Sequence, residues 1–137
     1  MVDTDPSVIP AFIGLLFANR GRTMAGIDCW GAPYLMFPAV TRGRITVPAY
    51  DTISCFDVEG TGAAIAAGAR EWVPVAAGEE RLLDLVVLRV DGSPTHVGVV
   101  VEPGLFLHIQ AHHRSRVERL DDWRLRVVGF YRHRELA

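Results

Sequence analysis

The chain has 137 residues, of which 50% are hydrophobic and 22% are charged, and its formal net charge at pH 7 is −2. This length and composition suit one globular domain that spans residues 1–137 and can bury a proper core. The weak net charge gives no reason to expect binding to nucleic acid, and no apolar run is long enough to insert into a membrane.

Two short helices are predicted before residue 40. Ser7 is placed to cap the first, with Pro10 in its first turn and Gly14 at its end. A glycine-bearing loop over residues 19–25 then leads to Cys29, which we expect at the start of the second helix.

Two prolines constrain this second helix. Pro33 requires either that the helix begins near Trp30 or that its first turn is distorted, because a proline beyond the first turn removes a backbone hydrogen bond. Pro38 should end the helix.

The middle of the chain shows little periodicity. Residues 45–50 are a candidate edge strand, and we expect Cys55 to be a small buried hydrophobe. The alanine-rich stretch 61–70 predicts a helix, and residues 71–75 form either a linker or a short strand.

From residue 81 onward the pattern becomes that of strands. β-Branched or alternating segments, separated by turn pairs such as Asp91-Gly92 and Pro103-Gly104, predict five strands. They cover residues 84–90, 95–101, 105–110, 115–120 and 126–132. Short helices followed by consecutive strands indicate an α+β fold in which the helices pack on an antiparallel sheet of five to six strands.

Cys29 and two later histidines are the candidate catalytic residues. Unpaired backbone N–H groups and the positive end of the helix dipole favour the thiolate of Cys29 over its thiol. A thiolate nucleophile needs a base, and His96 is the candidate; His108 would accept a hydrogen bond from the far nitrogen of His96 and fix its tautomer. Backbone N–H groups at the helix start, including that of Cys29, are candidates to hold the oxyanion.

The two histidines flank the Pro103-Gly104 turn, so the register of this hairpin decides whether they meet. Facing positions in an antiparallel hairpin have a constant index sum, and only an even sum places His96 and His108 on one face. We therefore predict a three-residue or bulged turn. Gly98, on the same face as His96, would leave room for a substrate or for the Cys29 helix.

Four segments occur in the order and spacing of a known family: Gly26-Ile27-Asp28-Cys29-Trp30-Gly31, Asp84-Leu85-Val86-Val87-Leu88, Thr95-His96-Val97-Gly98-Val99-Val100 and Leu107-His108. From about residue 11 to 132 the chain resembles the NlpC family of papain-like cysteine peptidases, which cut the stem peptides of peptidoglycan. The resemblance implies an NlpC fold with Cys29 as nucleophile, His96 as base and His108 as third member, without a metal or other cofactor. We predict a substrate site that includes Asp28, Trp30, Phe17 and Gly98.

The closer likeness is to the short peptidases of long-tailed phage tail tips and of related prophage or gene-transfer particles. It rests on residues 13–17 and Gly21-Arg22 before Asp28-Cys29-Trp30-Gly31, on residues 115–119 and on residues 128–132. The resemblance implies a protein that is carried in the virion and bound to a tail hub or baseplate protein. The chain opens without the basic and apolar regions of a secretory signal, so we expect synthesis in the bacterial cytoplasm without a signal peptide.

Four positions depart from the family pattern but leave the catalytic positions in place, and one of them is Pro33, which interrupts the helix that follows Cys29. Phe17 stands twelve positions before Cys29, where the family commonly has a tyrosine whose hydroxyl lies near the oxyanion. Trp30 stands where a small serine often follows the cysteine, which would narrow the cleft. Leu83 stands where a glycine is usual.

Other interpretations remain open. A structural tail-tip subunit would keep the fold to dock a hub protein, through an apolar surface rimmed by arginine, and would show no thiol reactivity at Cys29. A zinc site could combine Cys29, His96 and His108 with His112 or His113, although they lack the close paired spacing of structural zinc motifs. The last two histidines are otherwise solvated loop residues or contacts at the cleft rim. Asp28 either caps the helix or binds a substrate amine.

Overall fold

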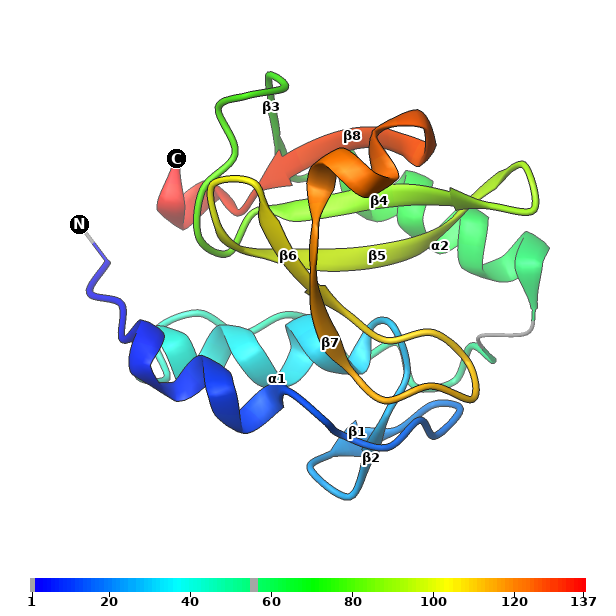
Figure 1. Cartoon of the computed structure of the whole chain (residues 1–137), viewed down its shortest axis with the longest axis horizontal. Coiled ribbons are helices and arrows are strands. Elements are labelled where there is room, and N and C mark those ends of the chain that lie inside the picture. Colours follow the sequence, from blue (N-terminus) through cyan, green and yellow to red (C-terminus); the bar gives the residue numbers. More distant parts are fainter. Residues whose placement is uncertain (1, 55–56) are drawn as a thin grey trace.

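A computed structural model describes residues 2–54 and 57–137, so Cys55 lies outside the described residues. One six-stranded antiparallel sheet, in the order β3-β8-β4-β5-β6-β7, forms the centre of the fold (Figure 1). The strands are β3 (Val73–Val75), β4 (Leu85–Val90), β5 (Ser93–Glu102), β6 (Leu105–His108), β7 (Arg116–Arg119) and β8 (Val127–Arg132). The prediction of an α+β fold is therefore confirmed. The ends of the five predicted strands shift by at most two residues, and β3 is the sixth.

A 3-10 helix, η1 (Pro6–Phe12), takes the place of the first predicted helix. Its cap is Asp5, whose carboxylate accepts a hydrogen bond from the N–H of Ser7, so the prediction that Ser7 is the cap was wrong. A short β-hairpin follows where a loop was predicted: β1 (Arg22–Thr23) pairs with β2 (Gly26–Ile27).

The helix that follows Cys29 is α1 (Gly31–Val40), with Trp30 at its N-cap. Pro33 therefore lies in the first turn, where the backbone N–H groups have no helical partner and a proline is tolerated. The prediction that Pro38 ends the helix was wrong, because α1 continues to Val40. A proline this near the end interrupts little of the helix, which stops two residues later.

The segment between α1 and the next helix is held by side chains. Residues 45–50, predicted as an edge strand, form none. The Arg22 Nε group donates to the carbonyl of Ala49 (2.6 Å), and the indole of Trp30 donates to that of Pro48 (2.5 Å). The alanine-rich helix, α2 (Val58–Ala69), starts earlier than predicted because Asp57 caps it by accepting from the N–H of Gly60.

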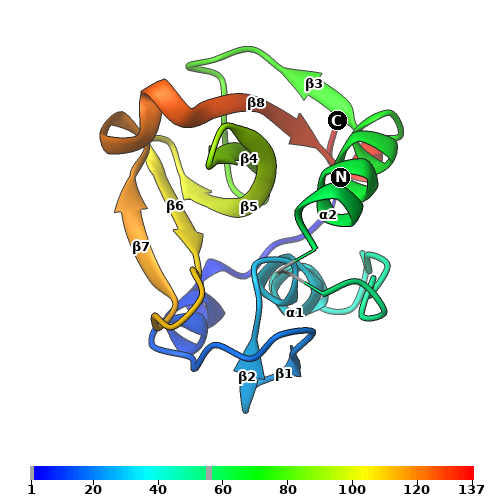
Figure 2. The same cartoon turned by 90° about the vertical axis from the view of Figure 1, so that its right-hand side faces the viewer.

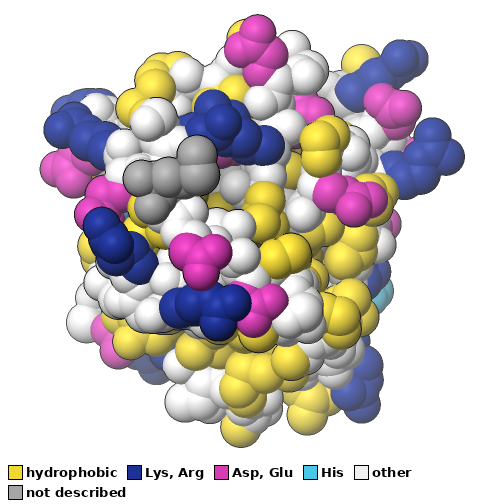
Figure 3. Space-filling view, turned by 90° about the vertical axis from the view of Figure 1, so that its left-hand side faces the viewer, with side chains coloured by type: hydrophobic (Ala, Val, Ile, Leu, Met, Phe, Trp, Pro, Cys, Tyr) yellow, Lys and Arg dark blue, Asp and Glu magenta, His cyan; other side chains and the backbone are white. Residues whose placement is uncertain are grey.

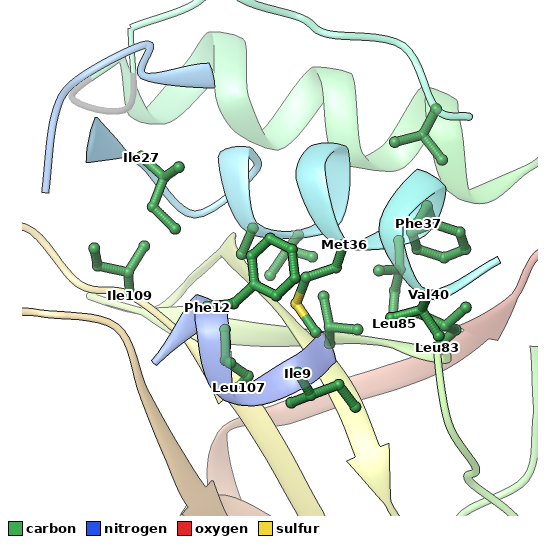
Figure 4. Close-up of a cluster of buried hydrophobic side chains, with 14 of the residues drawn as sticks. Ile9, Phe12, Ile27, Met36, Phe37, Val40, Leu83, Leu85, Leu107 and Ile109 are labelled. Carbon is green, nitrogen blue, oxygen red and sulfur yellow. The ribbon is translucent and has the colours of Figure 1, made fainter. Parts of the chain in front are cut away.

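The sheet has an apolar core on each face. In Figure 1, η1 and α1 lie on one side of β4 and β5, and the 3-10 helix η2 (Leu120–Arg126) lies on the other. Figure 4 shows the larger core, in which side chains of η1, α1 and the sheet meet, among them Phe12, Met36, Phe37, Leu85 and Leu107. The smaller core consists of Val86, Leu88, Val100, Phe106, Leu120, Trp123 and Phe130. Successive residues of β4 thus enter opposite cores, as the period of a strand requires.

The sheet is strongly curved, and η2 links β7 to β8 (Figure 2). A partly buried ion pair links Asp84, directly before β4, to the neighbouring strand β8, where the guanidinium of Arg132 donates to both carboxylate oxygens of Asp84 at 2.8 and 2.7 Å. On the face shown in Figure 3, basic and acidic side chains lie beside one another. Among the described residues, no helix has the length and apolar character needed to cross a membrane.

Candidate active site

The loop that carries Cys29 is fixed by the carboxylate of Asp28, which is only 3% exposed. One oxygen accepts from the N–H groups of Trp30 (3.2 Å) and Gly31 (3.0 Å) and from the Arg22 guanidinium (2.6 Å). The other accepts from the N–H of Arg20 (3.0 Å). Asp28 therefore caps the start of α1, and its contact with a substrate stays a prediction.

Glycines let the hairpin β1–β2 approach the first turn of α1 closely. A Cβ atom on Gly31 would lie 2.4 Å from the carbonyl oxygen of Gly21 and 2.7 Å from the Cβ of Ile27. Such distances are below van der Waals contact, so only glycine fits at this position without a shift of the backbone. The backbone on both sides of Cys29 is thus held by the hairpin and by the cap of α1.

The register of the β5–β6 hairpin brings the two predicted histidines together. Val99 pairs with Leu107 and Val100 with Phe106, an even index sum, whereas Glu102 pairs with Leu105 beside the turn. A bulge between Val100 and Glu102 makes this change, as predicted. The Nε2 atom of His96 lies 2.8 Å from Nδ1 of His108, and both side chains are buried.

A carboxylate extends this pair and was not recognised in the sequence. Oε2 of Glu118 on β7 forms a short hydrogen bond with Nε2 of His108 and accepts another from the indole of Trp123 (3.1 Å). Phe106 on β6 faces Glu118 across the β6–β7 pair, which puts Glu118 on the His108 face of the sheet. The alternating pattern of residues 115–120 indicates a strand, but only the pairing of β7 with β6 shows that Glu118 lies beside His108.

Glu118, at one end of this chain of hydrogen bonds, decides which nitrogen of each histidine carries the proton. Burial raises the pKa of Glu118, but the hydrogen bond from His108 and the charge of Arg116 outweigh it, and the net pKa lies below its ordinary value. An ionised carboxylate only accepts, so Nε2 of His108 carries a proton and its Nδ1 accepts from Nε2 of His96. The lone pair of His96 is then on Nδ1.

Burial disfavours the charged form of both histidines. Burial, together with the nearby His108 and Arg116, lowers the pKa of His96 to about 3. Burial also lowers the pKa of His108, although its hydrogen bond to Glu118 opposes this shift. A neutral His96 can accept a proton, which is the state that a general base requires.

Cys29 lines two cavities. The smaller, about 80 Å³, is mostly apolar and lies between α2, the segment 48–53 and the sheet. The larger, about 360 Å³, contains both Cys29 and His96. Its remaining lining is Phe17, Val90, Asp91, Thr95, Ile109, Gln110, Ala111 and His113. The predicted nucleophile and base therefore line one cavity, together with several polar side chains.

The other predicted substrate contacts do not all line the cavity that Cys29 and His96 share. Phe17 lines the larger cavity, with its ring 5.9 Å from that of His112. Trp30 lines the smaller cavity and meets Tyr50 edge-on at 5.3 Å. The space beside Gly98 is filled by the Phe106 ring, since a Cβ on Gly98 would lie 2.6 Å from it. The sequence correctly indicates a close approach at Gly98, but the neighbour is a core side chain.

Within the described part of the chain, no three His, Cys, Asp or Glu side chains gather in a way that could hold a metal ion. The zinc alternative, which combined Cys29, His96 and His108 with His112 or His113, gains no support from this arrangement. His113 is exposed and lines the larger cavity, in keeping with a place at the rim.

No protein-family model matches the sequence, and comparison with curated proteins gives no match either. Solved structures do match. An NlpC/P60 family protein from Bacillus cereus is 21% identical, with a TM-score of 0.69 over 96% of this chain and 41% of that one. The NlpC/p60 domain of the peptidoglycan hydrolase SagA is 16% identical, with a TM-score of 0.64 over 93% and 98% of the two chains.

NlpC2 from Trichomonas vaginalis is 16% identical to this chain, with a TM-score of 0.68 over 93% of this chain and 44% of that one. The chain thus spans about two fifths of the Bacillus cereus and Trichomonas vaginalis proteins and nearly all of the SagA domain. At these identities the likeness is one of fold, and the predicted NlpC-type fold is confirmed.

Proposed function

We propose that this protein is a cysteine peptidase that hydrolyses the stem peptides of peptidoglycan. The observation that carries the proposal is the chain of hydrogen bonds from Glu118 through His108 to His96, which leaves a proton acceptor at the cavity that Cys29 lines. The substrate class is supported by the fold, because one structural neighbour is a peptidoglycan hydrolase.

In the proposed reaction, Nδ1 of His96 accepts the thiol proton of Cys29, and Sγ attacks the carbonyl carbon of the scissile amide. His96 then returns the proton to the leaving amine, and water hydrolyses the thioester by the same route. The N–H groups of Trp30 and Gly31 already donate to Asp28, so we do not assign them to the oxyanion; the N–H of Cys29 stays a predicted donor. Phe17 has no hydroxyl to add.

The first test replaces the nucleophile. Cys29→Ala should abolish cleavage of a γ-glutamyl-diamino acid peptide and of purified peptidoglycan, while the circular dichroism spectrum and melting temperature stay those of the parent. Cys55→Ala is the matched control and should keep its activity. Full activity in the Cys29 variant would rule out the proposal.

A second measurement separates a peptidase from a structural subunit that has kept only the fold. In the Cys55→Ala background, Cys29 should be alkylated by iodoacetamide well below the ordinary thiol pKa of about 8.5, because a thiolate paired with His96 is the reactive form. A structural subunit would instead react along an ordinary thiol titration curve.

We also propose that the protein is carried in a phage or phage-like tail tip, bound to a hub or baseplate protein, where it opens the wall for genome entry. The support is the sequence resemblance over residues 13–17, 21–22, 28–31, 115–119 and 128–132. Ile13, Leu16 and Met24 are 47–53% exposed, and such a partner would cover apolar side chains of this kind. Immunogold labelling of purified phage or phage-like particles should mark the tail tip. Absence of the protein from these particles would contradict this placement.

A further inference from the structure

We propose that Glu118 is a positioning residue that sets the direction of the hydrogen bonds through both histidines and stabilises the charge that forms on His96 during the reaction. This inference rests on the proposed function. Glu118 is not among the described residues that line the two cavities of Cys29, and its hydrogen bond to His108 links it to the site.

The carboxylate of Glu118 is held from three sides. Besides its bond to His108, Oε2 accepts from the indole of Trp123 (3.1 Å) and lies 3.3 Å from Nη2 of Arg116. The His108 ring is itself packed between Phe106, at 4.6 Å, and Trp123, which meets it edge-on at 5.0 Å. The His108 ring is fully buried between these neighbours, and three donors hold the carboxylate of Glu118 against it.

The first consequence concerns tautomers. In a chain of two hydrogen-bonded imidazoles, either ring can donate to the other, and an acceptor at the end of the chain decides which one does. With Glu118 present, both histidines are protonated on Nε2. Without that acceptor, His108 can donate from Nδ1 to Nε2 of His96. The remaining proton of His96 then occupies Nδ1, and His96 can no longer accept a proton from Cys29.

The second consequence concerns charge. When His96 takes the proton of Cys29 it becomes an imidazolium in a buried site, where an uncompensated charge is unfavourable. Glu118 is the carboxylate at the other end of the relay and offsets this charge through His108. Arg116 on β7 opposes it, and Asp91 and His113 line the cavity on the side of Cys29. Glu118 therefore favours the charged pair of Cys29 and His96 over the neutral pair.

Two variants separate these effects. Glu118→Gln keeps an oxygen that can accept from His108 but removes the charge, whereas Glu118→Ala removes both. Asp121→Asn is the control, because Asp121 is an exposed carboxylate that pairs with Arg119 at the surface. The circular dichroism spectrum and melting temperature of each variant show whether it is folded.

Nitrogen-15 NMR of the histidine side chains reads the tautomers without any substrate. We expect Nε2–H on His96 and His108 in the parent, in Glu118→Gln and in Asp121→Asn, and Nδ1–H on His96 in folded Glu118→Ala. An unchanged His96 tautomer in Glu118→Ala would overturn the positioning role. This result is independent of whether the protein cleaves peptidoglycan, so a failure of the proposed function is recognised separately, by an inactive parent.

The rate of Cys29 alkylation against pH reads the charge effect. In the Cys55→Ala background, Glu118→Gln should shift the profile toward higher pH and lower kcat with little change in KM. We expect a fall in kcat on the order of 10- to 100-fold, less than the loss when the aspartate of a serine-protease triad is neutralised, because Glu118 acts through a second ring. Asp121→Asn should leave both readouts unchanged. A Glu118→Gln profile that coincides with the parent would overturn the charge role.

Discussion

At the scale of single residues, the acidic residue before the cysteine has a structural task. The sequence allows Asp28 either to cap a helix or to bind a substrate amine. The structure engages both of its oxygens with groups of the chain itself, including the largely buried guanidinium of Arg22. A buried charge with this many partners orders the loop, and its removal leaves Arg22 without compensation.

We therefore expect Asp28→Ala to lower the free energy of unfolding by about 3 kcal/mol or more, since it removes both a helix cap and one member of a buried ion pair. Asp3→Ala is the matched control, because Asp3 pairs with Arg42 in an exposed site where ion pairs contribute little. Urea denaturation of the two variants gives the comparison. Equal small losses would show that the Asp28 contacts do not stabilise the fold.

At the scale of elements, the β5–β6 hairpin positions the two histidines, and Gly98 makes its packing possible. The Phe106 ring fills the space that a side chain at position 98 would need, and the same ring packs against His108. Gly98 therefore allows the packing of Phe106 that holds the His108 ring in place.

Gly98→Ala should lower the free energy of unfolding by about 1–3 kcal/mol, because the added methyl group must displace Phe106 in a packed core. It should also reduce activity by moving His108. Gly62→Ala on α2 is the control, since its Cβ would meet only a methyl of Thr95 at an ordinary 3.8 Å and alanine favours a helix. Thermal melts and peptide cleavage measure both. A Gly98 variant as stable and active as the parent would contradict this account.

At the scale of the whole molecule, the buried histidines make stability depend on pH. His96 and His108 have folded pKa values below the unfolded value of 6.5, so the unfolded chain binds more protons as the pH falls below that value. Glu118 acts in the same direction, because its folded pKa lies below its ordinary value of 4.5 and its contribution is lost as the pH falls through that range. Acid therefore opposes folding.

We expect the free energy of unfolding to fall between pH 6.5 and pH 4, with each buried histidine adding up to about 1.4 kcal/mol per pH unit to the slope. Urea denaturation at a series of pH values measures this slope. His96→Gln should flatten it, whereas substitution of the exposed His113 should leave it unchanged. A slope that is the same with and without His96 would show that this histidine is not held neutral by the fold.

The sequence by itself determined two α-helices and the five strands from residue 84 onward, the α+β class, and the need for a three-residue or bulged turn between His96 and His108. These follow from local rules, because hydrophobic period, turn residues and the parity of a hairpin are properties of neighbouring residues. Where two local signals competed, the prediction failed: Asp5 replaced Ser7 as the first cap, and Pro38 did not end α1.

The tertiary structure alone decided which side chains complete the site. The pairing of β7 with β6 brings Glu118 to His108. The packing of the Phe106 ring in the smaller core fills the space beside Gly98. Both facts depend on residues far apart in the chain whose contacts are set by how elements pack. Local sequence patterns do not determine that packing, so they cannot predict Glu118 as the partner of His108 or Phe106 as the neighbour of Gly98.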